Sequence, residues 1–248
     1  MLERIQTYFD VGKIHKHGLQ SIIYRISSIK DLQVLFNHFD KYPLVTQKLA
    51  DYNLFKLAYY AMINKEHLIQ KGLLKLVAIK GSLNSGLSPE LQSAFPMVIN
   101  ADNPLVEGSS QKFPNPNGLA GFATGEGCFY VVAQKRETFK MGCSFKLKFS
   151  IAQHYRDEAL LKSLIDYLGC GILYKNRETI ELVFTHFTEI EEQIIPFFAK
   201  YPIACIKYLD YKDFCKVADI IKEKGHLTIE GRNAILKIKQ GMNTGRII

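Results

Sequence analysis

The stretch GLAGFATGEGCF, residues 118–129, joins a run of small residues to an aromatic segment. Glycine, alanine and threonine fill most of 118–125, and the three glycines and the threonine are weak helix formers. The run ends in a single carboxylate, Glu126, and the residues that follow it, CFYVVAQ, favour a strand. The sequence therefore predicts a short helix over 117–125 with one acid at its end, and this composition requires a reason beyond helix propensity.

The composition describes a globular, basic protein. Of the 248 residues 47% are apolar and 12% aromatic, which excludes a disordered chain. A net charge of +8 and a pI near 9.1 favour nucleic acid or another anionic partner, although a merely basic protein is the alternative. The sequence contains no apolar run of the roughly 18 residues that a membrane span requires, so we expect no membrane partner. The five cysteines form no CxxC pair and are interpreted as thiols in a reducing compartment.

Two parts of the chain repeat each other at an offset of 159 residues. The offset aligns 38–55 with 197–214, 64–73 with 223–232 and 79–86 with 238–245. The counterpart of residue 118 would precede Met1, so the first copy lacks the small-residue helix and the hairpin after it. We predict a truncated first repeat over 1–88, a linker rich in Pro, Asn and Ser over 89–116, and a complete second repeat over 117–248.

The second repeat predicts an α+β fold with the order helix, strand, strand, helix, strand, strand, helix, followed by further helices. Apolar periodicity and turn residues indicate strands at 129–136, 144–153, 172–176 and 180–187. The same signals indicate helices at 156–169, 188–202, 206–223 and 228–243. We expect each repeat to form an antiparallel sheet with helices on one face.

Alternation along the strands predicts a polar, basic sheet face that suits the major groove of DNA. The expected DNA-binding residues are Tyr130, Val132, Gln134, Arg136, Ser144, Lys146, Lys148, Ser150, Tyr174, Asn176 and Arg177 in the second repeat, and Lys13, His15 and His17 in the first. An ordinary solvated sheet face is the alternative interpretation, because antiparallel sheets commonly expose one side to water.

The stretch at 118–129 resembles the motif of the LAGLIDADG homing endonucleases, in the form found in single-chain organellar members. The segments FSIAQHYRD, KYPLVTQKLADY, HLIQKGL and IKGSLNSGLS are also similar to that family. The resemblance implies that one motif helix per repeat packs against its mate along a pseudo-twofold axis, where small residues allow close backbone approach. It assigns this helix interface to Gly118, Ala120, Gly121 and Thr124.

The resemblance also implies a catalytic site. Glu126 would be the metal-binding acid, with the Gly125 carbonyl as a second ligand of Mg²⁺ or another divalent cation. Lys207 and its repeat mate Lys48 would stabilise charge at the phosphate, and Gln153 would lie near the attacking water.

The expected function is therefore site-specific, metal-dependent cleavage of double-stranded DNA by an organelle-encoded, mitochondrial intron product. The alternative is an intron RNA maturase or a remnant that binds nucleic acid without catalysis. Because the first repeat lacks its own acid, a homodimer or a missing upstream segment would be needed for cleavage of both strands.

Overall fold

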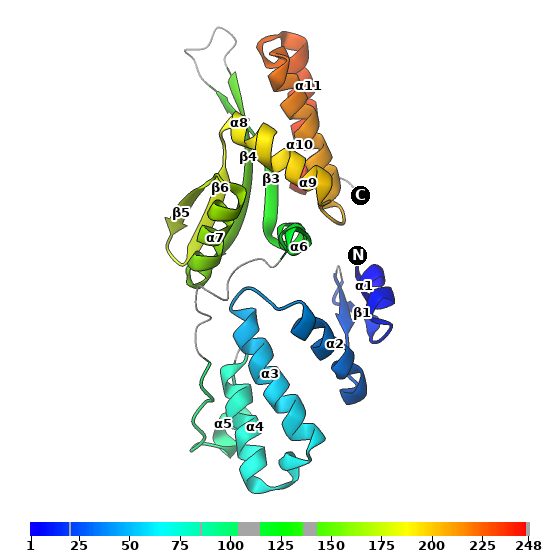
Figure 1. Ribbon diagram of the computed structural model, residues 1–248, viewed down its shortest axis with the longest axis vertical. Helices are drawn as coiled ribbons and strands as arrows, with labels where there is room; N and C mark the ends of the chain where they lie inside the picture. The colour runs from blue at the N-terminus through cyan, green and yellow to red at the C-terminus, as the bar shows by residue number, and fades with distance from the viewer. Residues whose placement is uncertain (20, 85, 104–114, 136–142, 247–248) are drawn as a thin grey trace. The chain divides into compact units, whose positions relative to one another are not determined.

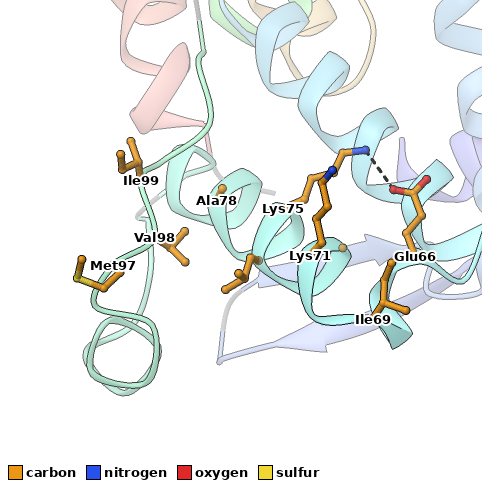
Figure 2. A pocket seen from close by; sticks show the side chains of 10 residues that line it. Glu66, Ile69, Lys71, Lys75, Ala78, Met97, Val98 and Ile99 are labelled. Atoms are coloured by element: carbon orange, nitrogen blue, oxygen red, sulfur yellow. Dashed lines mark hydrogen bonds and ion pairs between the residues drawn. The ribbon is translucent and has the colours of Figure 1, made fainter.

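A computed structural model describes residues 1–19, 21–84, 86–103, 115–135 and 143–246. The chain forms two compact units, unit 1 over Met1–Gln111 and unit 2 over Lys112–Ile248 (Figure 1). Each unit combines helices with an antiparallel sheet, which confirms the predicted α+β class.

Unit 2 contains a four-stranded antiparallel sheet in the order β3-β4-β6-β5. The strands are β3 (Gly127–Lys135), β4 (Cys143–His154), β5 (Ile172–Asn176) and β6 (Thr179–Phe184). The predicted sheet is confirmed. The last strand ends at Phe184 rather than at 187, because a helical segment already begins at Phe187.

The helices of unit 2 precede and follow these strands. They are α6 (Pro116–Glu126), α7 (Glu158–Leu168), α8 (Phe187–Glu189), α9 (Ile195–Lys200), α10 (Lys207–Lys222) and α11 (Ile229–Gln240). The single helix expected over 188–202 is instead interrupted by a π-helical segment, Ile190–Ile194. Pro196 follows this segment. Proline has no N–H to donate, and its ring would clash with the carbonyl four residues earlier, so the helix widens at this point.

The core of unit 2 lies between the sheet and the helices. Phe129 and Phe149 stack with centroids 4.7 Å apart, and Phe198 and Phe214 meet the Phe129 ring edge-on at 5.6 and 5.2 Å. Aromatic pairs in this geometry add to the stabilisation that burial provides. The strands therefore direct one face toward the helices and leave the other face to solvent.

Unit 1 repeats the second part of unit 2. Its elements are α1 (Leu2–Phe9), β1 (Lys13–His17), β2 (Ser21–Arg25), α2 (Ile29–Lys41), α3 (Lys48–Ile63), α4 (Gln70–Ser82) and α5 (Pro89–Ala94). The bounds of β1 and α3, shifted by 159 residues, coincide with those of β5 and α10. Within the described part of unit 1 there is no counterpart of α6, β3 or β4, and its sheet has two strands.

The repeat also matches at glycines that the backbone requires. Gly72 and Gly231 are the third residues of the equivalent helices α4 and α11, each of which follows a 3₁₀ turn. A Cβ atom at Gly72 would lie 1.9 Å from the Glu66 carbonyl oxygen, and one at Gly231 would lie 2.2 Å from that of Gly225. Glycine is therefore needed at both positions to let the turn approach the helix.

The first part of the expected linker packs on unit 1. The Ala101 amide donates a hydrogen bond to the Ala78 carbonyl at 3.0 Å, and the Asn103 side chain donates to Asp51 Oδ1 at 3.3 Å. Residues 104–114, the rest of the expected linker apart from its last two residues, lie outside the described residues.

Equivalent side chains on α3 and α10 are buried to different extents, and this predicts that the same substitution destabilises the protein more at one than at the other. Phe214 on α10 is fully buried, whereas its repeat mate Phe55 on α3 is 39% exposed. We expect Phe214→Ala to lower the free energy of unfolding by about 3–5 kcal/mol, the usual cost of emptying a phenylalanine site in a core. Phe55→Ala, the matched control, should cost roughly 1 kcal/mol or less, because little cavity forms at an exposed site. Urea denaturation followed by circular dichroism checks this, and equal costs would contradict it.

Candidate functional site

The outward side chains of β3, β4, β5 and β6 form one face, here called the open face. Tyr130 lies opposite Lys148, Val132 opposite Lys146 and Gln134 opposite Ser144 across β3 and β4. Across β5 and β6, Tyr174 lies opposite Glu181 and Asn176 opposite Thr179. The structure therefore brings these predicted residues together on the side away from the buried phenylalanines: Tyr130, Val132, Gln134, Ser144, Lys146, Lys148, Tyr174 and Asn176.

Three other predicted residues of this group differ from the rest. Ser150 has the parity of the open face, but it is 3% exposed and presents almost no side chain to a ligand. Arg177 lies in the turn between β5 and β6 with a left-handed φ of 53°, and it is exposed. Arg136 lies outside the described residues.

The predicted residues of unit 1 lie on β1. Lys13, His15 and His17 are exposed at alternate positions of that strand, opposite Arg25, Ile23 and Ser21 of β2. Because β1 of the first repeat corresponds to β5 of the second, these residues correspond to the β5 part of the open face.

Sequence reasoning missed Glu181, an acid in the middle of the open face. Its carboxylate lies 2.8 Å from the Lys148 ammonium, and that ammonium lies 5.6 Å from the centre of the Tyr130 ring. A hydrogen bond with Cys128, partial burial and the charge of Glu181 raise the pKa of Tyr130 to about 12, so its hydroxyl remains protonated at neutral pH. The alternation along TIELVF that buries Ile180 and Leu182 could have identified Glu181.

Helix α6 delivers Glu126 to the start of β3. Asn115 caps the helix by accepting a hydrogen bond from the Gly118 amide at 2.9 Å, and Pro116 occupies its first turn. Leu119 and Ala123 are fully buried and anchor one side of the helix. Glu126 is exposed, and within the described part of the chain its carboxylate has no hydrogen-bond partner.

The predicted helix-interface residues divide between two sides of α6. Ala120 is buried, and the Thr124 hydroxyl donates to its carbonyl at 2.8 Å and accepts from the Ala204 amide at 3.0 Å. These two residues therefore pack within unit 2. Gly121 is exposed, and a Cβ atom at this position would meet nothing within 4 Å; Gly118 is partly exposed on the same helix.

Lys207 is brought to the end of α6. Its ammonium donates to the Gly125 carbonyl at 3.0 Å and lies 3.4 Å from the Ala123 carbonyl. A cation is stabilised there because the last carbonyls of a helix carry the negative end of its dipole. The predicted neighbours Gly125, Glu126 and Lys207 therefore form one cluster, here called the α6 terminus.

The other two predicted catalytic residues lie differently. Lys48 is 63% exposed and pairs with Asp51 at 3.3 Å on its own helix. Gln153 lies on β4, two residues beyond Ile151, which is opposite Gly127. Gln153 is thus near the same end of the sheet as the α6 terminus, but on the helix-covered side of the strand.

A buried polar network, also missed from sequence, fixes α10 against β3. Asp210, one turn after Lys207, accepts hydrogen bonds from the Asn243 amide at 3.0 Å and from Arg246 Nη2 at 2.7 Å. The Asn243 side chain donates to the Phe129 carbonyl at 3.0 Å. Since β3 follows Glu126 directly, this network fixes the helix that carries Lys207 against the strand that begins next to the acid.

The Arg246 guanidinium also contacts Asp213, at 2.6 Å. Burial opposes ionisation of Asp213, but hydrogen bonds from Lys216 and Arg246 outweigh it and hold the pKa of this carboxyl below its usual value. The repeat-matched aspartates Asp51 and Asp210 were a signal of this arrangement in the sequence.

No three His, Cys, Asp or Glu side chains in the described part of the chain gather as ligands of a metal ion would. No helix among the described residues has the length and apolar character needed to cross a membrane.

The fold and the motif helix define a nuclease class. The sequence profile of the LAGLIDADG endonucleases matches residues 1–59 and 119–218. The chain belongs to the LAGLIDADG endonuclease family. The chain is 38% identical over 239 residues to "Probable intron-encoded endonuclease 3" of Neurospora crassa, covering 95% of this chain and 44% of that protein. It is 37% identical over 255 residues to "Probable intron-encoded endonuclease 2" of the same fungus, and this match covers 98% of this chain and 55% of that protein. The chain thus spans about half the length of these relatives.

A solved structure has the same fold. The crystal structure of the I-SmaMI LAGLIDADG homing endonuclease bound to cleaved DNA superposes with a TM-score of 0.95 at 45% identity. The match covers 99% of this chain and 83% of that one. I-SmaMI has also been solved with an uncleaved DNA target in the presence of calcium ions, and as a double mutant of two lysines.

Proposed function

We propose that the chain is a site-specific endonuclease of double-stranded DNA that requires a divalent cation. The observation that carries this proposal is the α6 terminus, where an exposed carboxylate, a backbone carbonyl and the Lys207 ammonium meet beside the first residue of β3. The open face of the same sheet provides lysine, tyrosine, glutamine and asparagine side chains for binding DNA.

The donor atoms of the α6 terminus fit a hard cation. Mg²⁺ and Ca²⁺ prefer carboxylate, carbonyl, water and phosphate oxygens, and Glu126 and Gly125 present the first two. When bound, such a cation lowers the pKa of an attacking water and stabilises the leaving oxygen of the phosphate. The structure of I-SmaMI with an uncleaved DNA target in the presence of calcium ions supports this choice of cofactor.

Lys207 would act on the phosphate itself. Its ammonium is held by two helix carbonyls, and it is placed to exchange one of them for a phosphate oxygen when DNA binds. Positive charge aimed at the phosphate stabilises the negative charge that develops in the transition state. The two lysines of the I-SmaMI double mutant are 159 residues apart, which is also the separation of Lys48 and Lys207.

Double-stranded DNA fits the open face better than intron RNA does. The major groove of B-DNA is about 12 Å wide and admits a two-stranded ribbon, whereas that of A-form RNA is too narrow for side chains to enter. The net charge of +8 favours DNA and RNA equally. The shape of the groove therefore distinguishes the two, and it favours double-stranded DNA. The names of the Neurospora relatives also support an intron-encoded gene, and we propose that it is mitochondrial.

Selection and cleavage together test the proposal. We expect the 248-residue chain to enrich one sequence from random duplexes in Ca²⁺, and to convert a supercoiled plasmid carrying it to nicked circles in Mg²⁺. One cut strand is expected because α6 supplies one acid for each chain. Linear plasmid would instead indicate that a second copy of the chain supplies the other acid. Enrichment without any cut would contradict endonuclease activity.

A further inference from the structure

The ion pair between Lys148 and Glu181 lies on the open face, between two tyrosines. Lys148 on β4 and Glu181 on β6 approach to 2.8 Å with side chains 28% and 32% exposed. Tyr130 on β3 lies opposite Lys148, and Tyr174 on β5 lies opposite Glu181. The pair is thus half-buried, held from both sides, and still open to a ligand that lies on the face.

Glu181 is unusual on a surface that binds a polyanion. A carboxylate there repels phosphates, and a partly exposed ion pair contributes little to protein stability. The Lys148 ammonium offsets part of this repulsion, and a hydrogen bond donated by the DNA would satisfy the rest of the carboxylate. In the major groove, the donors available for this are the exocyclic amino groups of cytosine and adenine.

The two side chains present a donor beside an acceptor, with the spacing of a base pair. Guanine O6 and cytosine N4 are hydrogen-bonded to each other, and so lie about 2.9 Å apart on the major-groove edge. Resting on the proposed function, we infer that Lys148 and Glu181 together recognise one G·C pair. Lys148 donates to guanine O6 and N7, and Glu181 accepts from cytosine N4. The pair determines sequence specificity at one position of the target.

The same chemistry ranks the other base pairs. A T·A pair keeps the order of acceptor and donor, but the thymine methyl group replaces the second acceptor, N7, that guanine offers to Lys148. C·G and A·T pairs place an amino group against the ammonium and a carbonyl oxygen against the carboxylate. The expected order is therefore G·C first, T·A second and both reversed pairs last.

Exchanging the two charges tests this directly. The double variant Lys148→Glu/Glu181→Lys keeps the net charge and the ion pair, so a purely structural role would be preserved. We expect randomised-duplex selection to change one position of the target from G·C to C·G, with a preference of about tenfold or more in each case. The other positions should keep their wild-type preference. Lys146→Met is the matched control. It removes a neighbouring lysine of the same strand and face, and it should leave the base preference at the position read by Lys148 and Glu181 unchanged.

Each outcome decides the inference. A swapped variant that still selects G·C, or a wild-type target in which no position responds to the swap, would overturn it while leaving the proposed function intact. A wild-type chain that enriches no duplex sequence would overturn both. If the swapped chain does not fold, Lys148→Met/Glu181→Met replaces it, because paired apolar side chains keep the packing and should remove the preference at that position alone.

Discussion

Glu126→Gln is expected to lower the rate of DNA strand cleavage by about a thousandfold or more. Glutamine has nearly the shape of glutamate, but it lacks the negative charge that binds a divalent cation. Glu126 is exposed at the end of α6, and among the described residues it has no hydrogen bond that the substitution would break. The fold and the contacts of the open face should therefore remain.

The measurement is single-turnover cleavage of the selected duplex in Mg²⁺, with duplex affinity measured in parallel in Ca²⁺. Affinity should fall far less than the rate, since the strands that bind DNA are unchanged. Glu192→Gln is a suitable control, because it removes an exposed acid from the π-helical segment of the same unit. Cleavage by Glu126→Gln at the wild-type rate would exclude Glu126 as the metal-binding acid.

Lys207→Met is expected to lower the cleavage rate by about a hundredfold, the effect usual for loss of one group that stabilises transition-state charge. Methionine keeps most of the apolar stem and removes the ammonium that bonds the Gly125 carbonyl. A catalytic role predicts a change in rate at constant affinity for the duplex. A purely structural role at the helix end predicts a lower melting temperature instead, because the free energy of unfolding would fall by roughly 1 kcal/mol.

Lys222→Met provides the matched control for Lys207. It removes a lysine from the opposite end of α10, where the side chain is 67% exposed and pairs with Glu191. Both variants change the net charge equally, so nonspecific weakening of DNA binding affects both. Equal cleavage rates in the two variants would contradict a role for Lys207 at the phosphate.

The repeat predicted most of the fold. Because the offset of 159 residues was visible in the sequence, the bounds of one copy determined those of the other, and α3 and α10 coincide once shifted. Strand alternation also predicted the open face, since inward Phe145, Leu147 and Leu173 are each followed by an outward polar residue. The π-helical segment was missed because local apolar periodicity does not distinguish it from an α-helix.

The parts of the site that depend on long-range contacts were not predictable. Asp210 and Arg246 are 36 residues apart and meet only because α11 returns the chain to the start of α10. The Thr124 hydroxyl accepts from the Ala204 amide, 80 residues further along the chain, and its own stretch of sequence gives no sign of this contact. Ser150 has the parity of the open face and yet is buried, which depends on neighbouring side chains rather than on its own strand.

A crystal structure of the chain with its selected duplex in Ca²⁺ would test the proposed site. Calcium has an anomalous signal and binds oxygen at about 2.3–2.6 Å. We predict a calcium peak at this distance from the Glu126 carboxylate and from a phosphate oxygen of the duplex, with the open face in the major groove. A calcium ion bound away from Glu126, or a duplex bound to another surface, would contradict both the proposed site and the proposed function.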